Sequence, residues 1–311
     1  MESIFIALGG NALLRNSDRR TYDSQLRRAE EAFHHLNGIV QDNLAVISHG
    51  NGPQVGDILI QNELSRDTTP AMPLFACGSM SQGIIGDLLL TAYEATRPPG
   101  RRTKDPAYVI TRTLVDSQDE AFQSPTKYIG PFYDRETAEN LAAQKGWTVR
   151  EQEGKGWRRV VPSPEPIRII ERDVIKHLLD TGVLPICTGG GGTPVAEVNG
   201  RLAGVEAVID KDLASSVLAG SLSFQRFMIL TDVPNVFINY GKSSQKALEH
   251  ITLDALKEMY ASGQFPAGSM GPKVKAAIRF LESGGEMVNI TSLENCGKAI
   301  REGSGTVVTR N

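Results

Sequence analysis

The chain has 311 residues, of which 40% are hydrophobic and 22% are charged, and this balance is typical of a globular protein whose core can serve one large domain or two. The formal net charge of −3 disfavours a nucleic-acid-binding protein, because phosphate contacts usually demand a basic excess. No uninterrupted apolar run approaches the roughly 18 residues of a membrane span, and the start, MESIFIALGG, lacks the basic segment of a signal peptide, so we expect a cytoplasmic protein that does not bind a membrane.

In the first part of the chain, short apolar runs alternate with segments of helical spacing. Residues 4–8 are apolar at both odd and even positions, which is typical of a strand buried on both faces. Residues 22–41 place apolar side chains at steps of three and four, which predicts one buried helical face. Ser79 and Gln82 have the spacing of a capping box, which predicts that a helix begins there. The other predicted elements of this part are strands at 44–47 and 107–111.

The motif HGNGPQVG, residues 49–56, follows the strand at 44–47 and precedes apolar positions with helical spacing. An Asn-Gly pair between two strands would predict a hairpin, but the helical spacing favours a strand-to-helix turn. Such a turn exposes backbone N–H groups at the positive end of a helix, where an anion can bind. We therefore interpret this motif as a candidate anion site rather than a plain turn.

From residue 170 to the end of the chain the same alternation continues. Strands that alternate with helices predict right-handed crossovers and a mostly parallel sheet with helices on both faces, so the predicted fold class is α/β with three αβα layers. Helices are predicted at 172–180, at 210–219, after Thr252, from about Pro272 to Gly284 and near the C-terminus, and strands at 183–187, 227–230, 287–290 and 306–309.

Residues 115–168 interrupt this rhythm. The stretch contains SPTKYIGPFYDRE, both tryptophans and VVPSPEP, and it is too long for a plain loop in a compact domain. We expect a small inserted subdomain at 115–168 within a single domain that spans residues 1–311.

Four glycine-rich or turn-rich junctions follow or neighbour the predicted strands. Ligands of open parallel sheets bind beyond the carboxyl ends of the strands, and glycine lets the backbone approach a ligand closely. The chain has neither a P-loop nor a dinucleotide-binding fingerprint, so neither standard nucleotide fold is supported. The junctions are LGGNA at 8–12, HGNGPQVG at 49–56, TGGGGTPV at 188–195 and AGSMGPKVK at 267–275.

Two lysines lie where helices are predicted to begin. Lys211 lies between Asp210 and Asp212, and Lys273 lies in GSMGPKVK. A lysine at this end of a helix opposes the helix dipole, so an anion bound between the two would relieve the conflict. With backbone amides, the two lysines would form a polyphosphate site, which is most of what phosphoryl transfer requires. By its position alone, Asp210 fits the role of a helix cap at least as well as it fits a catalytic role.

The histidines and cysteines do not predict a metal site. His49 lies in HGNGPQVG, where it either contacts a ligand or holds the loop by a hydrogen bond, and both interpretations stay open. The other four histidines have no metal-ligand spacing and are expected at the surface or in caps. Cys77, Cys187 and Cys296 have no paired spacing, which predicts reduced thiols rather than a disulfide frame or a zinc site.

Taken together, these motifs closely resemble, in the same order, those of the carbamate kinases, a family of the amino acid kinase superfamily. The resemblance runs from residue 4 to residue 309 and includes the inserted segment. The superfamily shares the glycine loops and the late lysine, whereas HGNGPQVG and KYIGPFY are peculiar to the carbamate enzymes. The motifs are ALGGNALL, HGNGPQVG, SPTKYIGPFY, GGGGTPV, EAVIDKDLASSVLA, LTDV with INYGK, and AGSMGPKVKAAI.

The resemblance implies the amino acid kinase fold, with an acceptor site in the N-terminal half, a nucleotide site in the C-terminal half and the inserted subdomain as a lid. It implies that Lys211 and Lys273 hold the phosphates, that Asp210 orients them and that Lys127 reaches over the carbamoyl phosphate. Other superfamily members have a lysine where this chain has Ala7, and Lys127 is a sensible replacement for that charge. The implied acceptor-site residues are Gly9, Gly10, Asn11, Gly50, Asn51 and Gly52, and the implied nucleotide-site residues are Thr231, Asp232, Val233, Tyr240, Ala267, Gly268, Ser269, Met270 and Gly271.

The implied reaction is reversible phosphoryl transfer between ATP and carbamate, giving ADP and carbamoyl phosphate, in a homodimer that generally makes ATP during arginine or related nitrogen catabolism. Carbamate is already an anion, so its oxygen needs no general base. No cluster of carboxylates is evident in the sequence, so we expect Mg²⁺ to be held mainly by nucleotide phosphates and water, with Asp210 as the protein contact. Two alternatives remain: an amino acid kinase with another small carboxylate or phosphate acceptor, and a non-catalytic nucleotide sensor. Ala7 and Lys127 count against the first, and the retained charged residues of the phosphate site count against the second.

Overall fold

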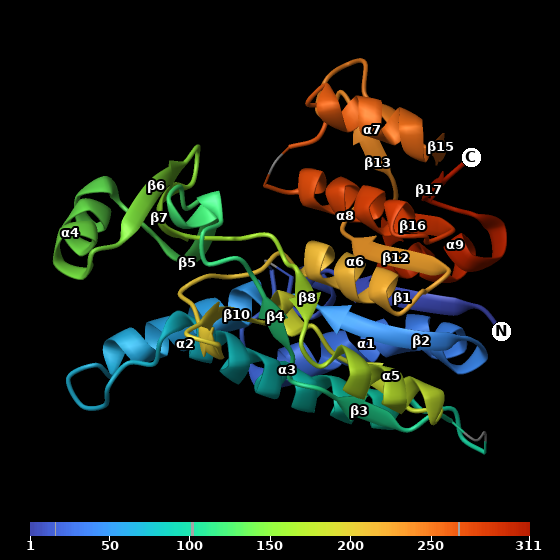
Figure 1. The fold of residues 1–311 in the computed structure, drawn as a ribbon, viewed down its shortest axis with the longest axis horizontal. Coiled ribbons are helices and arrows are strands. Elements are labelled where there is room, and N and C mark those ends of the chain that lie inside the picture. The colour runs from blue at the N-terminus through green and yellow to red at the C-terminus, as the bar shows by residue number, and fades with distance from the viewer. Residues whose placement is uncertain (16, 101–102, 267) are drawn as a thin grey trace.

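A computed structural model of the chain describes residues 1–15, 17–100, 103–266 and 268–311. Its largest sheet has the strand order β15-β17-β16-β12-β1-β2-β9-β3 (Figure 1). Every neighbouring pair in this sheet is parallel except β16 with β17, which confirms the predicted α/β class and mostly parallel sheet. The strands are β1 (Ser3–Leu8), β2 (Leu44–His49), β3 (Pro106–Tyr108), β9 (Leu184–Ile186), β12 (Arg226–Thr231), β15 (His250–Thr252), β16 (Met287–Ser292) and β17 (Thr306–Thr309).

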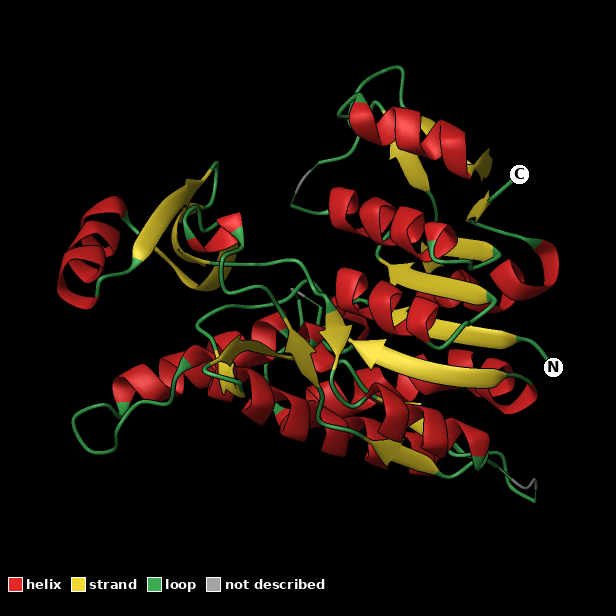
Figure 2. Ribbon diagram, in the orientation of Figure 1, coloured by secondary structure: helices red, strands yellow, loops and turns green. Residues whose placement is uncertain are grey.

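Helices cover both faces of this sheet, as Figure 2 shows in red. Strand β1 is buried on both sides: Phe5 and Ala7 belong to one apolar cluster, and Ile4 and Ile6 belong to the other. The alternation of side chains along the strand thus divides the core into two layers. The helices that contribute to the cluster of Ile4 are α1 (Tyr22–Asp42), α3 (Leu74–Thr96) and α9 (Cys296–Glu302), and those of the other cluster are α5 (Arg172–Asp180), α6 (Lys211–Ser221), α7 (Leu253–Ala261) and α8 (Met270–Glu282).

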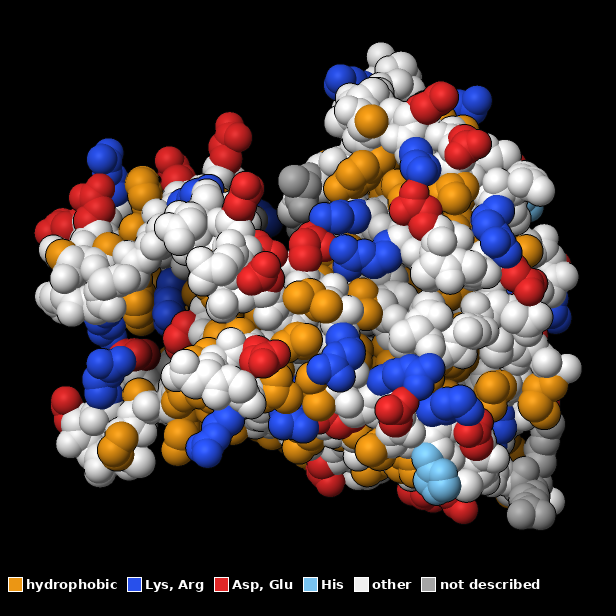
Figure 3. Space-filling model, in the orientation of Figure 1, with side chains coloured by type: hydrophobic (Ala, Val, Ile, Leu, Met, Phe, Trp, Pro, Cys, Tyr) orange, Lys and Arg blue, Asp and Glu red, His pale blue; other side chains and the backbone are white. Residues whose placement is uncertain are grey.

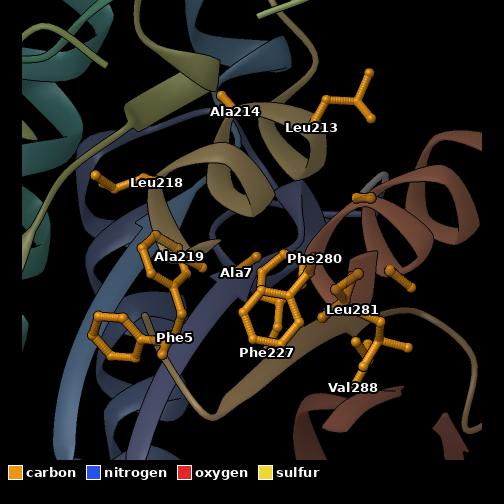
Figure 4. Close-up of a cluster of buried hydrophobic side chains, with 14 of the residues drawn as sticks. Phe5, Ala7, Leu213, Ala214, Leu218, Ala219, Phe227, Phe280, Leu281 and Val288 are labelled. Atoms are coloured by element: carbon orange, nitrogen blue, oxygen red, sulfur yellow. The ribbon is translucent and has the colours of Figure 1, made fainter. Parts of the chain in front are cut away.

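The layer of α6 and α8 is packed around aromatic rings (Figure 4). The ring of Phe227, on β12, lies 5.9 Å from that of Phe5 and 5.4 Å from that of Phe280 on α8. All three side chains are fully buried, and Leu218 of α6 belongs to the same cluster. Because these large side chains are fully buried and closely packed, they strongly favour one position of α6 and α8 relative to the sheet. Their N-termini are therefore fixed beyond the carboxyl ends of the central strands.

Residues 115–168 contain a small separate sheet, drawn in green at the left of Figure 1. Three antiparallel strands pair in the order β5-β7-β6, and α4 (Arg135–Lys145) connects β5 to β6. We call this part, residues 127–161, the β5–β7 unit. Its strands are β5 (Lys127–Tyr133), β6 (Thr148–Gln152) and β7 (Gly156–Val161).

A second, four-stranded sheet has the order β11-β10-β4-β8, in which β4 and β8 flank the β5–β7 unit in the chain and β10 and β11 follow β9. The strand predicted at 107–111 is only partly right, because the main-sheet strand β3 ends at Tyr108 and the next strand begins at Arg112 in this second sheet. The remaining elements are β4 (Arg112–Leu114), β8 (Arg168–Ile169), β10 (Thr193–Val198), β11 (Arg201–Gly204), β13 (Val236–Ile238), β14 (Lys246–Leu248), α2 (Gly52–Leu64) and the short 3₁₀ helices at Gly10–Ala12, Glu120–Phe122, Gly189–Gly191 and Leu293–Asn295.

The predicted helix start at Ser79 is wrong, because α3 begins at Leu74 with Pro73 as its N-cap. Ser79 and Gln82 lie inside the helix and use their polar atoms on a neighbouring strand. The Ser79 hydroxyl lies 2.7 Å from Oγ1 of Thr193, and Nε2 of Gln82 donates to the same oxygen at 3.1 Å. The two residues that have the spacing of a capping box therefore contact β10 instead of capping a helix.

Of the helices that the structure describes, α3 alone is long and apolar enough to cross a membrane by length and composition. Its Leu88, Leu89 and Tyr93 are fully buried, and the Tyr93 ring lies 5.3 Å from that of Phe33 on α1. Packing in the core accounts for the apolar character of these positions.

Candidate active site

The junctions that follow β1 and β2 lie side by side, because these strands are parallel neighbours. A Cβ on Gly50 would lie 3.3 Å from the backbone nitrogen of Gly10 and 3.9 Å from Cε of Lys211. A Cβ on Gly10 or Gly52 would meet nothing within 4 Å, so both glycines border open space. The predicted acceptor-site glycines are thus brought together with one of the predicted phosphate-binding lysines.

Helix α2 begins directly after Asn51, which confirms the strand-to-helix turn predicted for HGNGPQVG. Asn51 is the N-cap residue, but its side chain does not cap the helix. Instead, its Nδ2 donates to Oγ of Ser81 on α3 at 2.8 Å. The first N–H groups of α2 therefore keep the capacity to bind an anion.

The glycines of TGGGGTPV are required by contacts within the protein. Gly190 has a φ of +61°, and a Cβ there would lie 2.1 Å from Cγ of Asn51. A Cβ on Gly189 would lie 2.5 Å from the hydroxyl of Tyr108, and one on Gly191 would lie 2.6 Å from the carbonyl oxygen of Ile209. This junction packs against the side chain of Asn51. The sequence predicted instead that its glycines let the backbone approach a ligand.

His49 holds the loop, which is one of its two predicted alternatives. Its side chain is fully buried, Nδ1 donates to the carbonyl of Gly50 at 2.9 Å, and Nε2 accepts from the hydroxyl of Tyr108 at 2.8 Å. Burial lowers the pKa of His49 to about 4, and the charge of Lys211 acts in the same direction. The imidazole is therefore neutral at pH 7, with both nitrogens engaged.

Asp210 caps α6 and also contacts the β5–β7 unit. Its Oδ1 accepts from the backbone nitrogens of Asp212 at 3.0 Å and Leu213 at 3.4 Å. Its Oδ2 accepts from Nζ of Lys127, the first residue of β5, at 2.8 Å. The capping interpretation is correct, and the second oxygen gives the same carboxylate a role beyond capping.

Asp212 joins the two predicted phosphate-binding lysines, and the sequence interpretation did not assign it a role. Nζ of Lys211 lies 2.5 Å from its Oδ1, and Nζ of Lys273 lies 3.2 Å from its Oδ2. Only 4% of the Asp212 side chain is exposed. The signal available in the sequence was the triplet Asp-Lys-Asp at a helix start, which places a second carboxylate beside Lys211.

The charges of this trio stabilise one another. Burial opposes ionisation of Asp212, but the two ammonium groups outweigh it and hold the pKa of Asp212 below its usual range. Burial lowers the pKa of Lys211, whereas the charge of Asp212 raises the pKa of Lys273. Two ammonium groups against one carboxylate leave one positive charge in excess at the site. The arrangement is suited to an anionic ligand.

The predicted nucleotide-site residues that the structure describes lie at the end of β12, at the start of α8 and, for Tyr240, after β13. The charge of Asp232, after β12, also raises the pKa of Lys273, so these two residues are near each other. Ser269 is the N-cap of α8 without a side-chain cap bond. Tyr240 lies after β13, is 63% exposed, and has no described contact with the lysines. Ala267 and the side chain of Asn11, both predicted for the site, lie outside the described part of the chain.

A pocket of about 280 Å³ lies at the same edge of the sheet. It connects the junctions that follow β1, β12 and β16, and the surface beside the β5–β7 unit is also hollowed (Figure 3). Residues predicted for the acceptor and for the nucleotide therefore line the same pocket. Its lining includes Gly9, Arg15, Thr231, Asp232, Leu293 and Glu294.

Within the described part of the chain, no group of three or more His, Cys, Asp or Glu side chains converges as a metal site. Magnesium that arrives with nucleotide phosphates needs only one or two carboxylates, because it keeps several waters. Both oxygens of Asp212 are engaged by lysine ammonium groups, whereas among the described residues Asp210 meets a single ammonium group, that of Lys127 at Oδ2, so Asp210 fits this role better than Asp212.

Comparison with known proteins agrees with this geometry. The model of the amino acid kinase family matches residues 2–292. The carbamate kinase of Thermococcus kodakarensis is 47% identical over 314 aligned positions, which cover 100% of both chains, and that of Thermoplasma volcanium is 48% identical over 309, which cover 99% of each. The solved carbamate kinase from Giardia lamblia bound to AMP-PNP has a TM-score of 0.93 and 44% identity, covering 100% of this chain and 99% of that one.

We predict that Gly190→Ala destabilises the protein by roughly 2 kcal/mol more than Gly200→Ala. Both glycines have positive φ, so both variants carry the strain of a left-handed residue, about 1 kcal/mol. Only at Gly190 must the new methyl group displace Asn51, since a Cβ on Gly200 meets nothing within 4 Å. The free energies of unfolding in urea give the comparison, and equal losses in the two variants would contradict it.

We predict that His49 makes the protein less stable as the pH falls from about 6.5 to about 4. In this window the unfolded state binds a proton at His49 and the folded state does not, because its pKa is lowered from 6.5 to about 4. The full effect is about 3 kcal/mol. Urea unfolding across this range should show a weaker pH dependence in His49→Gln than in the wild type. The exposed His34→Gln is the control, and an unchanged slope in His49→Gln would count against the assignment.

Proposed function

The chain belongs to the amino acid kinase family, and within it to the carbamate kinases, and we propose that it catalyses reversible phosphoryl transfer between ATP and carbamate, giving ADP and carbamoyl phosphate. The observation that carries the proposal is the set of three lysine ammonium groups held by two aspartates at the start of α6. The Giardia lamblia relative was solved with AMP-PNP, which supports a nucleotide as one substrate.

The main physical difficulty of this reaction is the repulsion between two anions, and the positive charges of the site reduce it. Lys211 and Lys273 are fixed by the buried Asp212 before a substrate arrives, so little reorganisation is needed when charge moves between the phosphoryl group and the leaving oxygen. The carbamate oxygen attacks without a general base because it is already ionised. The neutral, fully engaged His49 agrees with a site that needs no proton acceptor.

Two helix starts add further anion-binding capacity. The N-cap residues Asn51 of α2 and Ser269 of α8 make no side-chain hydrogen bond that caps their helix. In α8 the N–H of Gly271 already donates to the carbonyl of Pro266, so the remaining N–H groups of the two helix starts, with the helix dipoles, can act on phosphoryl oxygens. We assign the start of α2, with Gly10 and Gly50, to the carbamate side and the start of α8, with the residues after β12, to the nucleotide side.

We infer that the β5–β7 unit acts as a lid within this single domain. It delivers Lys127 to Asp210, so the positive charge reaches the site only when the unit is in place. Carbamate and carbamoyl phosphate are labile in water, and closure would exclude it.

Magnesium, a homodimeric state and a cytoplasmic location complete the proposal. Asp210 would be the protein contact of the ion, which would supply neutralisation of phosphate charge. The homodimer, the location and a role toward ATP synthesis in arginine or related nitrogen catabolism rest on the family resemblance.

The direct test is ATP formation from ADP and carbamoyl phosphate with Mg²⁺. We expect robust turnover in the wild type and a loss of roughly a hundredfold or more in Lys273→Ala, because one of the fixed ammonium groups is removed. A panel of other carboxylate and phosphate acceptors, assayed with ATP, runs in parallel. ADP binding without turnover on carbamoyl phosphate would refute the carbamate assignment, and activity on a panel member would identify the acceptor.

We predict that Lys127→Ala lowers turnover strongly, by roughly a hundredfold, and leaves ADP binding nearly unchanged. Lys127 acts from the β5–β7 unit, whereas the predicted nucleotide residues lie on β12 and α8. Turnover and ADP titration calorimetry should be measured beside Lys155→Ala, a control that removes an exposed lysine from the same unit. Normal turnover in Lys127→Ala would remove this residue from the mechanism.

A further inference from the structure

A second pocket, of about 330 Å³, lies between α2 and the β5–β7 unit. Its volume falls in the range of roughly 300–1,000 Å³ that is typical of small-molecule sites. Leu59 and Leu64 of α2, Ile129 and Tyr133 of β5, and Trp147 between α4 and β6 give it a mostly apolar lining. None of the residues assigned above to phosphoryl transfer lines it.

The pocket owes its opening to a bulge in β5. The pairing of β5 with β7 changes register between Ile129 and Tyr133, and Gly130 in the bulge has a φ of +72°. The guanidinium of Arg158 donates to the Gly130 carbonyl from Nε at 3.1 Å and from an Nη atom at 2.7 Å. A bulge bends a strand and redirects its side chains. Because Arg158 holds it, the opening is a built feature of the unit.

The guanidinium of Arg159 is the charged group in the lining that is available to a ligand. It lies 4.7 Å from the centre of the Trp147 ring, and no ion pair or hydrogen bond joins it to another residue in the part of the chain that the structure describes. Burial lowers the pKa of Arg159, and the charges of Glu206 and Glu63 only partly oppose this effect. Contact with an aromatic face leaves the in-plane N–H donors of a guanidinium available, and these match a carboxylate.

The other charged groups at the pocket are already paired. Glu63 forms ion pairs with Lys145 and Arg66, and Lys145 also lies over Trp147 at 4.9 Å. The negative charge of Glu63 is therefore balanced by its own partners. The pocket thus combines an apolar surface with the guanidinium of Arg159, which has no anionic partner of its own among the described residues. A ligand with an anionic group and an apolar body matches both, whereas a neutral or cationic ligand would leave the guanidinium without a counter-charge.

We propose that this pocket binds a small carboxylic acid with an apolar body, with the carboxylate on Arg159 and the body against Trp147 and α2. One strand links this site to the lysine cluster, because β5 carries Ile129 and Tyr133 at the pocket and Lys127 at Asp210. An occupant that fixes β5 against α2 therefore changes turnover. This second step rests on the proposed function, whereas the binding step does not.

Binding can be measured without an enzyme assay. The chain has two tryptophans, so Trp157→Phe leaves Trp147 as the only indole. In this background, titration with 4-phenylbutyrate should give a saturable change in Trp147 fluorescence. The neutral 4-phenylbutyramide should bind roughly ten- to a hundredfold more weakly, because it lacks the charge that pairs with Arg159. No saturable response to the acid, or equal affinity for acid and amide, would overturn the proposal.

Substitutions inside and outside the pocket test whether the acid binds at this site. Arg159→Gln should weaken binding of the acid by the same roughly ten- to hundredfold, whereas Arg150→Gln, which removes an exposed arginine from β6, should not change it. Ile60→Trp fills the pocket from α2 and keeps Arg159, and it should abolish binding while circular dichroism and the melting temperature stay near wild type. Binding to this variant is measured by titration calorimetry, because its new indole adds fluorescence of its own. Wild-type affinity in a folded Ile60→Trp would also overturn the proposal.

The coupling to turnover has its own measurement. Saturating 4-phenylbutyrate should change kcat for ATP formation in the wild-type protein and should have no effect in Ile60→Trp, whose pocket is filled. Binding without any change in kcat would overturn the coupling and leave the binding site standing. Absence of all turnover would instead count against the proposed function, and the fluorescence titration would still decide the binding step.

Discussion

The buried carboxylate of Asp212 is the interaction on which the site depends. Without it, the ammonium groups of Lys211 and Lys273 would be two like charges in a poorly solvated region, and each would oppose ionisation of the other. With it, both stay charged, and one positive charge remains for a ligand. Since removal of Asp212 would leave two buried ammonium groups uncompensated, the trio depends on this carboxylate.

The fold makes this unit possible by bringing two helix starts to one point. Lys211 and Asp212 begin α6, whereas Lys273 lies in the first turn of α8. The two helices pack on the same face of the sheet around Phe227 and Phe280. The apolar core therefore determines the spacing of the charges, and the glycine junctions determine how closely a ligand can approach them. The three helix starts are not equivalent, because α6 is capped by a carboxylate while α2 and α8 are not capped by side chains.

Local patterns in the sequence predicted what local interactions determine. The helix at 172–180 and the strand-to-helix turn at HGNGPQVG were correct, because apolar spacing and glycine placement act within a few residues. The helix start predicted at Ser79 was wrong, since its spacing reflects contacts with a strand more than a hundred residues away. The role of Asp212 was missed because its pairing with Lys273 spans 61 positions in the chain. The four glycines after β9 are evident in the sequence, but only the fold shows that Gly189 makes room for Tyr108 and His49 and that Gly190 makes room for Asn51.

Ala7 leaves β1 without a charged side chain at this position, and in the proposed mechanism part of the positive charge comes from the β5–β7 unit instead. Ala7 is fully buried in the cluster of Phe5 and Phe227, under the layer of α6 and α8 (Figure 4). A charge supplied from β1 would be present at all times, whereas under the proposed lid role Lys127 would supply it only when β5 lies against the main body. Because Lys127 bonds to the same carboxylate that caps α6, movement of the unit acts directly on the helix start that carries Lys211 and Asp212. In the proposed lid mechanism, closure of the unit and arrival of the charge at the site are therefore one event.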